Sequence, residues 1–179
     1  MMLKKVVLGL MAVGALAFTM SVAQADSDFE YAKQMKDLVK WMPNAKVTLD
    51  QGMKTAAAGG KAISAQYEVD EDAGFQLSVF VSKSGGAADA HEVIVNFEDG
   101  KIKSDEKLTD PDDIKDAGKQ LAAVEKAKVT LDQAVAEAVK ANPGYVAIRV
   151  VPKLSGDAAT AQVTLLKDGA TKKVTEKLD

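Results

Sequence analysis

The only histidine of the chain, His91, is the side chain best suited to acid–base chemistry, because imidazole titrates near neutral pH. A histidine that acts as a general base needs a nucleophile beside it and a group that orients its ring. A zinc site needs three or four ligands, and the chain has no cysteine and no second histidine to supply them. We therefore interpret His91 as a surface residue at the start of a strand. The sequence predicts no catalytic, cofactor-binding or metal-binding residue.

Two acidic clusters could be considered as calcium sites, because calcium prefers oxygen ligands. Asp110, Asp112 and Asp113 lack the spacing of a calcium loop and enclose Pro111, a combination that is typical of a helix start. The second cluster, residues 70–72, is typical of a solvated turn. Both clusters are therefore expected to have structural roles.

Three methionines, Met35, Met42 and Met53, lie near Trp41 in the sequence, and thioethers are soft ligands that suit Cu(I). Met35 and Met42 are seven residues apart and would share one face of a helix. Core packing uses the same spacing, and methionine fills irregular gaps well. We interpret these methionines as core residues.

Signatures of nucleotide and ester chemistry are missing from the sequence. The glycine pairs at 59–60 and 85–86 lack the lysine that a phosphate-binding loop requires. No Gly-x-Ser-x-Gly segment is present to form a nucleophile elbow. We expect that the protein is not an enzyme.

An exact internal repeat is the most informative feature of the sequence. The heptapeptide AKVTLDQ occupies residues 45–51 and returns unchanged at residues 127–133. The tail from Glu98 to Asp110 also resembles the tail from Lys167 to Asp179. Because repeats define architecture, the sequence predicts two related units, residues 26–110 and a shorter one, residues 111–179.

Both copies of the heptapeptide are expected to begin a helix. Thr48 and Thr130 are followed three residues later by Gln51 and Gln133, which is the pattern of a capping box. After each helix the hydrophobic period changes to two, which predicts strands. They are expected near residues 63–69, 77–81, 93–97, 145–151, 161–166 and 172–178. The predicted fold class is α+β, with two repeated units of helices followed by an antiparallel meander of three or four strands. The short connection between the units predicts direct packing.

This order of elements resembles the PepSY domain. The resemblance rests on residues 130–134, on the Pro143-Gly144 break, and on residues 92–96 with the turn at 100–102. Asn96 stands where the family usually has an aspartate, and the second copy ends almost with its last strand. The resemblance implies an exported bacterial protein with a non-catalytic binding role, of which peptidase inhibition is one form. It carries over no catalytic residue.

The first 25 residues have the pattern of a secretory signal peptide. Lys4 and Lys5 precede an apolar run over residues 6–20, and residues 21–25 end in a small-x-small site. The run of about 15 residues is shorter than the roughly 20 that a membrane-spanning helix needs. We therefore expect cleavage near Ala25 and a periplasmic or secreted protein without a stable membrane anchor. The lipoprotein route requires a cysteine, which the chain lacks.

The charge of the chain limits its partners. The formal net charge is −3, whereas nucleic acids and anionic membranes require a basic face. The leading hypothesis is an exported non-enzymatic module that binds a protein or peptide, for example a peptidase, through a sheet edge or face. The alternative is a small-molecule or metal-handling periplasmic protein that holds its ligand between two sheets or at the methionine helix.

Overall fold

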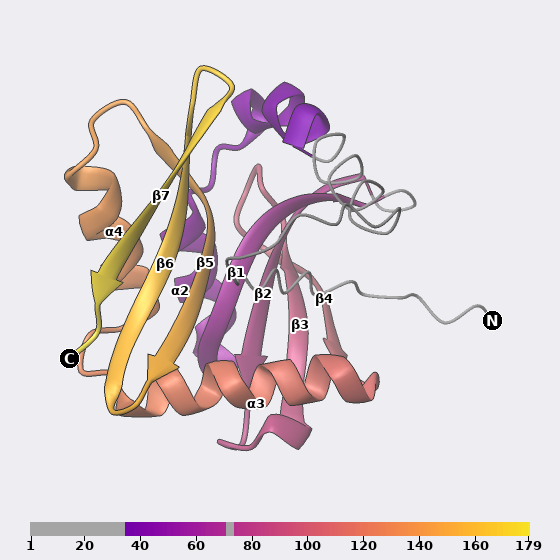
Figure 1. Ribbon diagram of the computed structural model, residues 1–179. Helices are drawn as coiled ribbons and strands as arrows, with labels where there is room; N and C mark the ends of the chain where they lie inside the picture. The colour runs from indigo at the N-terminus through magenta and orange to yellow at the C-terminus, as the bar shows by residue number, and fades with distance from the viewer. Residues whose placement is uncertain (1–34, 71–73) are drawn as a thin grey trace, which may run out of the picture.

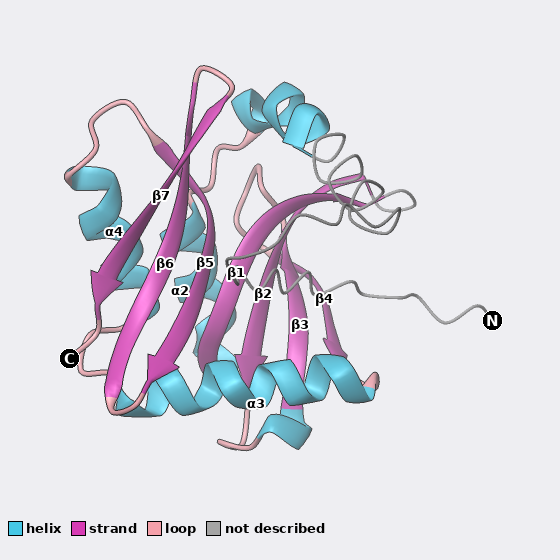
Figure 2. Cartoon of the chain, viewed as in Figure 1, coloured by secondary structure: helices cyan, strands magenta, loops and turns pink. Residues whose placement is uncertain are grey.

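The computed structural model describes residues 35–70 and 74–179, which form an α+β fold (Figures 1 and 2). The predicted signal peptide and its cleavage site near Ala25 lie outside the described residues. Residues 35–41 are helical, and the further helices are η1 (Met42–Asn44), α2 (Leu49–Ala56), η2 (Ala57–Gly59), η3 (Ala87–Asp89), α3 (Pro111–Lys126) and α4 (Leu131–Lys140). Among these residues, no helix combines the length and the apolar character needed to cross a bilayer.

All strands belong to one antiparallel seven-stranded sheet with the order β4-β3-β2-β1-β5-β6-β7. The strands are β1 (Lys61–Asp70), β2 (Gly74–Ser82), β3 (Ala90–Val95), β4 (Ile102–Lys107), β5 (Val146–Ser155), β6 (Ala158–Lys167) and β7 (Ala170–Lys177). The four strands of the first half therefore lie beside the three strands of the second half. The described residues form a single sheet, so they offer no space between two sheets for a ligand.

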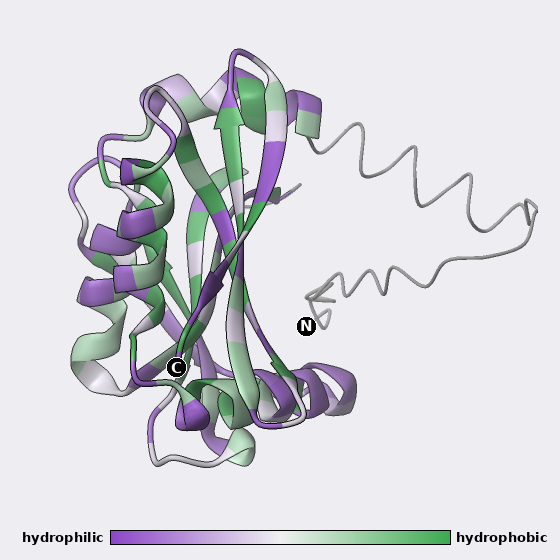
Figure 3. Cartoon of the chain, turned by 60° about the vertical axis from the view of Figure 1, so that its left-hand side comes forward, coloured by the Kyte–Doolittle hydropathy of each residue, from purple (hydrophilic) through white to green (hydrophobic). Residues whose placement is uncertain are grey.

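Helices cover the two faces of the sheet unequally. In Figure 1, α2 and α4 lie behind the sheet, whereas α3 crosses the lower end of its front face. The main core lies between the sheet and the rear helices and combines buried residues of both halves, such as Leu49, Leu77, Leu131 and Leu165. A smaller core under α3 contains Phe80 and other apolar residues of the front face. Hydrophobic and hydrophilic bands alternate along the strands in Figure 3.

The repeated heptapeptide forms the same local structure twice, as predicted. Thr48 and Thr130 are the N-caps of α2 and α4, and each helix begins with a capping box. The side-chain oxygen of Gln51 accepts a hydrogen bond from the backbone N–H of Thr48 at 3.0 Å, and Gln133 does the same for Thr130 at 3.1 Å. The first residue of each helix, Leu49 or Leu131, is a buried leucine.

The two halves join at the centre of the sheet, where β1 pairs with β5. Ala65 lies directly opposite Val150. Each of these strands carries one irregularity near its start, between Ala62 and Ser64 in β1 and between Ala147 and Arg149 in β5. A bulge increases local twist, so both central strands bend at similar positions.

The predicted match between the two tails is wrong. Leu108 follows β4, which pairs with the outer edge of β3, whereas Leu178 follows β7, which pairs with β6. The backbone oxygen of Leu178 accepts hydrogen bonds from the N–H groups of Lys128 and Val129, and the oxygen of Phe97 accepts those of Lys46 and Val47. Leu178 therefore contacts the second heptapeptide as Phe97 contacts the first. The two tails resemble each other in sequence because both contain the tripeptide Glu-Lys-Leu.

Candidate functional site

The outer edge of β7 is the longest regular strand edge that has no partner strand among the described residues. All eight residues of β7 pair in register with β6, and the ladder contains no bulge. At the opposite end of the sheet, β4 has six residues, and the register of its pairing with β3 shifts between Ile94 and Val95. Short, bulged edges are poor templates for strand addition, so β7 is the better one.

The register shows which backbone groups of β7 face outward. A two-residue turn joins β6 to β7, and both of its residues, Asp168 and Gly169, have positive φ, as type I′ hairpins require. The residues that flank such a turn form a hydrogen-bonded pair, and hydrogen bonding then alternates along the strand. The bond from the N–H of Leu178 to the oxygen of Ala159, 3.0 Å long, fits this alternation. The backbone groups that point away from β6 are those of Thr171, Lys173, Thr175 and Lys177.

The end of β7 is firmly anchored. Leu178 is completely buried, and its backbone bonds both to β6 and to the segment between α3 and α4. An edge that is held in an extended conformation loses little conformational entropy when it binds a partner. The bare edge of β7 is therefore preorganised for pairing.

Lysines dominate the side chains of β7. The Nζ atom of Lys172 donates to the Oδ1 atom of Asn142 at 2.6 Å and lies 6.0 Å from the ring centre of Tyr145. Lys167, at the end of β6, lies 5.6 Å from the same ring. In Figure 3, which turns β7 toward the viewer, much of this strand has the hydrophilic colour. The edge combines unpaired backbone groups with positive charge.

A half-buried carboxylate cluster lies on the front face of the first half, and sequence analysis missed it. The carboxylate of Glu68 accepts hydrogen bonds from Gln66 at 2.7 Å, from Gln76 at 2.8 Å and from Ser78. Burial, followed by the charge of Glu68, raises the pKa of the neighbouring Glu92 to about 7. The polar residues of an alternating strand were assumed to face solvent, so the pattern gave no signal for their burial.

The structure places His91 between two carboxylates. Its Nδ1 atom lies 2.8 Å from Asp105, its Nε2 atom lies 3.7 Å from Asp89, and its side chain is 17% exposed. Its position near the start of β3 agrees with the prediction, but the side chain is more covered than a surface residue. Both ring nitrogens face carboxylates, which leaves neither of them facing a hydroxyl or thiol nucleophile.

The acidic cluster at the start of α3 caps that helix. Asp110 is the N-cap, and its Oδ1 atom accepts from the N–H groups of Asp112 at 2.8 Å and Asp113 at 3.4 Å. In the second cluster, Asp70 ends β1, and the remaining two residues lie outside the described ones. In the described part of the chain, no group of three or more acidic or histidine side chains is arranged to hold a metal ion.

The methionines pack as predicted. Met53 is buried in α2, and Met35 and Met42 are partly buried against the main core. Trp41 remains 40% exposed and stacks on Phe75 with a centroid distance of 6.4 Å. These contacts fit a packing role for the helix over residues 35–41.

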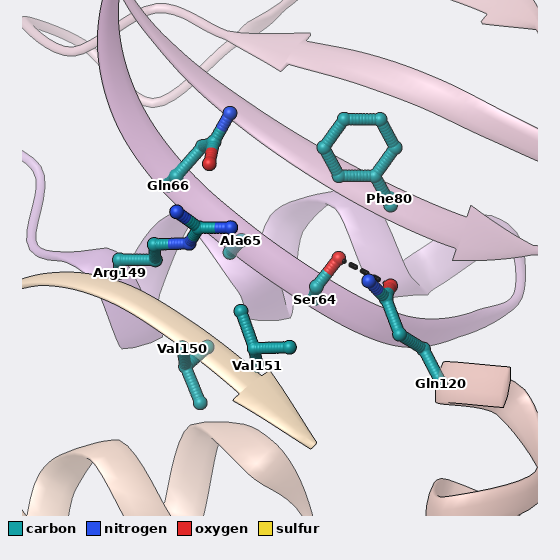
Figure 4. A pocket seen from close by; sticks show the side chains of 8 residues that line it. All are labelled: Ser64, Ala65, Gln66, Phe80, Gln120, Arg149, Val150 and Val151. Carbon is teal, nitrogen blue, oxygen red and sulfur yellow. Dashed lines mark hydrogen bonds between the residues drawn. The ribbon is translucent and has the colours of Figure 1, made fainter. Parts of the chain in front are cut away.

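Two of the hollows among the described residues bear on ligand binding. The first lies beside the hydrogen bond of 2.8 Å between Ser64 and Gln120, where α3 meets the sheet (Figure 4). Its volume of about 10 Å³ suits a single water molecule. The second is a shallow depression of about 350 Å³ lined by Met35, Lys36, Val39 and Gly169. Only the second has the size of a small ligand.

The comparisons with known proteins add no family. The chain matches no family model, and no curated protein or solved structure is significantly similar to it.

Proposed function

We propose that this chain is an exported, non-enzymatic binding module in which an extended segment of another protein adds to the sheet at β7. The bare edge of β7 is the observation that carries this proposal. Backbone pairing supplies affinity in such complexes, and side chains beside the edge supply selectivity. The signal-like first 25 residues support a periplasmic or secreted location, where the partner would be met.

The fold is proposed to be a tandem duplication of a PepSY-like unit. The pairing of Ala65 with Val150 is the centre of a two-fold relation, which places the bulges of β1 and β5 at equivalent positions. The relation also matches β3 to β7. Two steps outward from the central pair, from one cross-strand partner to the next, lead to Val93 in β3 and to Val174 in β7. The identical capping boxes and the shared contacts of Phe97 and Leu178 support the same relation.

This relation explains why β7 is a binding edge. In the first half, β4 lies along the outer edge of β3. In the second half, the described residues provide no strand at the corresponding place beside β7. A strand from a partner would fill the position that β4 fills in the first half. A secreted peptidase is a suitable partner class, because the PepSY resemblance implies such a role.

Proline at position 175 tests the proposal. The N–H of Thr175 points outward, so Thr175→Pro removes a donor from the edge and leaves the ladder to β6 intact. Thr175→Val keeps the donor and is the matched control. We expect that purified wild-type protein and the valine variant retain the same envelope partner or inhibit the same secreted peptidase, and that the proline variant does not. Equal retention by all three proteins would contradict strand addition at β7.

Small-molecule binding is a second candidate function, favoured by the depression beside Met35 and Gly169. Native mass spectrometry of protein purified from its own periplasm would test it. The expected result is a retained low-mass adduct that Val39→Glu removes, because the charge would lie in the apolar depression. A protein without adduct would contradict this candidate.

A further inference from the structure

We infer that the segment that adds to β7 is acidic, with carboxylates placed to meet Lys173 and Lys177. This inference depends on the proposed strand addition and names the chemical class of the partner. It rests on the direction of the side chains of β7, on the local charge of this edge, and on a contrast with the edge of β3.

Lys173 and Lys177 lie on the same face of β7, because side chains alternate along a strand. Lys173 lies opposite Thr164, which belongs to the face that α3 partly covers, and Lys177 lies opposite Thr160. Lys172 points to the other face, where Asn142 already binds it. An added strand would therefore meet two ammonium groups on the front face, four residues apart.

The charge of this edge is opposite to that of the whole molecule. The chain has a net charge of −3, but residues 167–177 contain four lysines and only two acidic residues. Lysines on a sheet edge discourage pairing with another apolar or basic strand. A segment that carries carboxylates turns this repulsion into attraction, so the same lysines would select an acidic partner.

In the first half, the position that corresponds to Lys173 carries a negative charge. Glu92 of β3 lies directly opposite Glu106 of β4, and the charge of Glu106 contributes to the raised pKa of Glu92. Lys173 takes the position of Glu92 in β7, because each residue directly precedes the valine of the central row. A glutamate opposite Lys173 would form an attractive cross-strand pair where the first half has a repulsive one.

Short synthetic peptides test the inference directly. The acidic probe is an acetylated threonine- and valine-rich peptide with glutamates four residues apart, and the basic probe replaces these glutamates by lysine. We expect that the acidic probe binds the full chain on the order of tenfold more tightly than the basic one, and less so at high salt. In the double variant Lys173→Glu/Lys177→Glu the preference should reverse. Circular dichroism verifies the fold, and Lys173→Glu alone is used if the double variant does not fold.

The possible outcomes separate the two proposals. Reversal of the preference, together with loss of binding in Thr175→Pro, supports both. Equal binding of the two probes that still requires the N–H of Thr175 overturns the acidic selectivity and retains strand addition. Binding of neither probe overturns both proposals. Both are also overturned if a single-stranded oligonucleotide binds as tightly as the acidic probe and Thr175→Pro does not weaken its binding. Dimerisation of the chain through β7, measured by sedimentation and abolished by Thr175→Pro, overturns the acidic partner in favour of a second copy.

Discussion

The strands β3 and β7 each lie third from the centre of the sheet. Among the described residues, only β3 has a further strand, β4, along its outer edge. On the covered side, Glu92 pairs with Glu106 of β4, and partial burial followed by the charge of Glu68 raises the pKa of Glu92 to about 7. On the bare side, the corresponding residue is Lys173, which remains exposed. The contrast teaches that two strands at equivalent places in the sheet differ in cover and in charge: the covered strand carries a glutamate where the bare strand carries a lysine, the residue type that discourages unspecific pairing at a sheet edge.

Loss of the anchor of β7 is expected to have the largest effect on this contrast. Leu178→Ala removes a completely buried side chain one residue before the end of the chain. We expect it to lower the free energy of unfolding by about 2–5 kcal/mol, because the cavity lies where β7 joins the core. Chemical denaturation monitored by circular dichroism measures the loss. Asp179→Ala, at the exposed last residue, is the control, and an equally small effect of both variants would show that β7 is not anchored in this way.

A difference in helix packing between the halves gives the next largest effect. A Cβ atom at Gly52 of α2 would lie 2.2 Å from the Cδ2 atom of the buried Leu77. The second half has Ala134 at the corresponding helix position and Ala161 at the strand position. Gly52→Ala should therefore lower the free energy of unfolding by about 1–3 kcal/mol, although alanine favours helices.

A double-mutant cycle sharpens this test. In the background of Leu77→Ala, the substitution Gly52→Ala should cost much less, because the two side chains no longer overlap. Thermal unfolding of the four proteins provides the coupling free energy. Stabilisation by Gly52→Ala alone would show that helix propensity, not the contact with Leu77, decides this position.

The carboxylate of Glu92 in β3 predicts a pH dependence of stability. The pKa of Glu92 is higher in the folded chain than in the unfolded one, so its contribution to stability is most favourable at low pH and declines as pH rises toward about 7. Glu92→Gln should therefore raise the free energy of unfolding by about 1–2 kcal/mol above neutral pH, and by little below about pH 4. Unfolding curves across this range measure the effect. Glu106→Gln, at the exposed neighbour, should show a smaller gain, and a constant gain at all pH values would contradict the raised pKa.

Local sequence signals predicted the helices and strands better than they predicted which strands lie side by side. The capping boxes at Thr48 and Thr130 occur as predicted, because a cap is a contact within four residues. Alternation predicted most strands, but it defines the face of a residue and not the adjacent strand. For this reason the sequence did not show that β1 and β5 join the halves into one sheet.

The candidate site was the least predictable feature. A strand edge can be recognised as a site only when the neighbouring strands of the sheet are known, so no residue type in the sequence indicates it. The sequence analysis also predicted no strand over residues 102–107, where the structure has β4. The similarity of the two tails in sequence gave no indication that β4 pairs with β3 and β7 with β6, or that Phe97 and Leu178 make the same backbone contacts.

The smallest expected effects compare the two copies of the heptapeptide. Thr48→Ala and Thr130→Ala should each lower the free energy of unfolding by about 1 kcal/mol, because each removes the side chain that caps a helix. The matched serine variants keep the hydroxyl group and should lose much less. A cost at only one threonine, measured by chemical denaturation, would show that identical residues have unequal roles and would weaken the two-fold relation from which the binding role of β7 is argued.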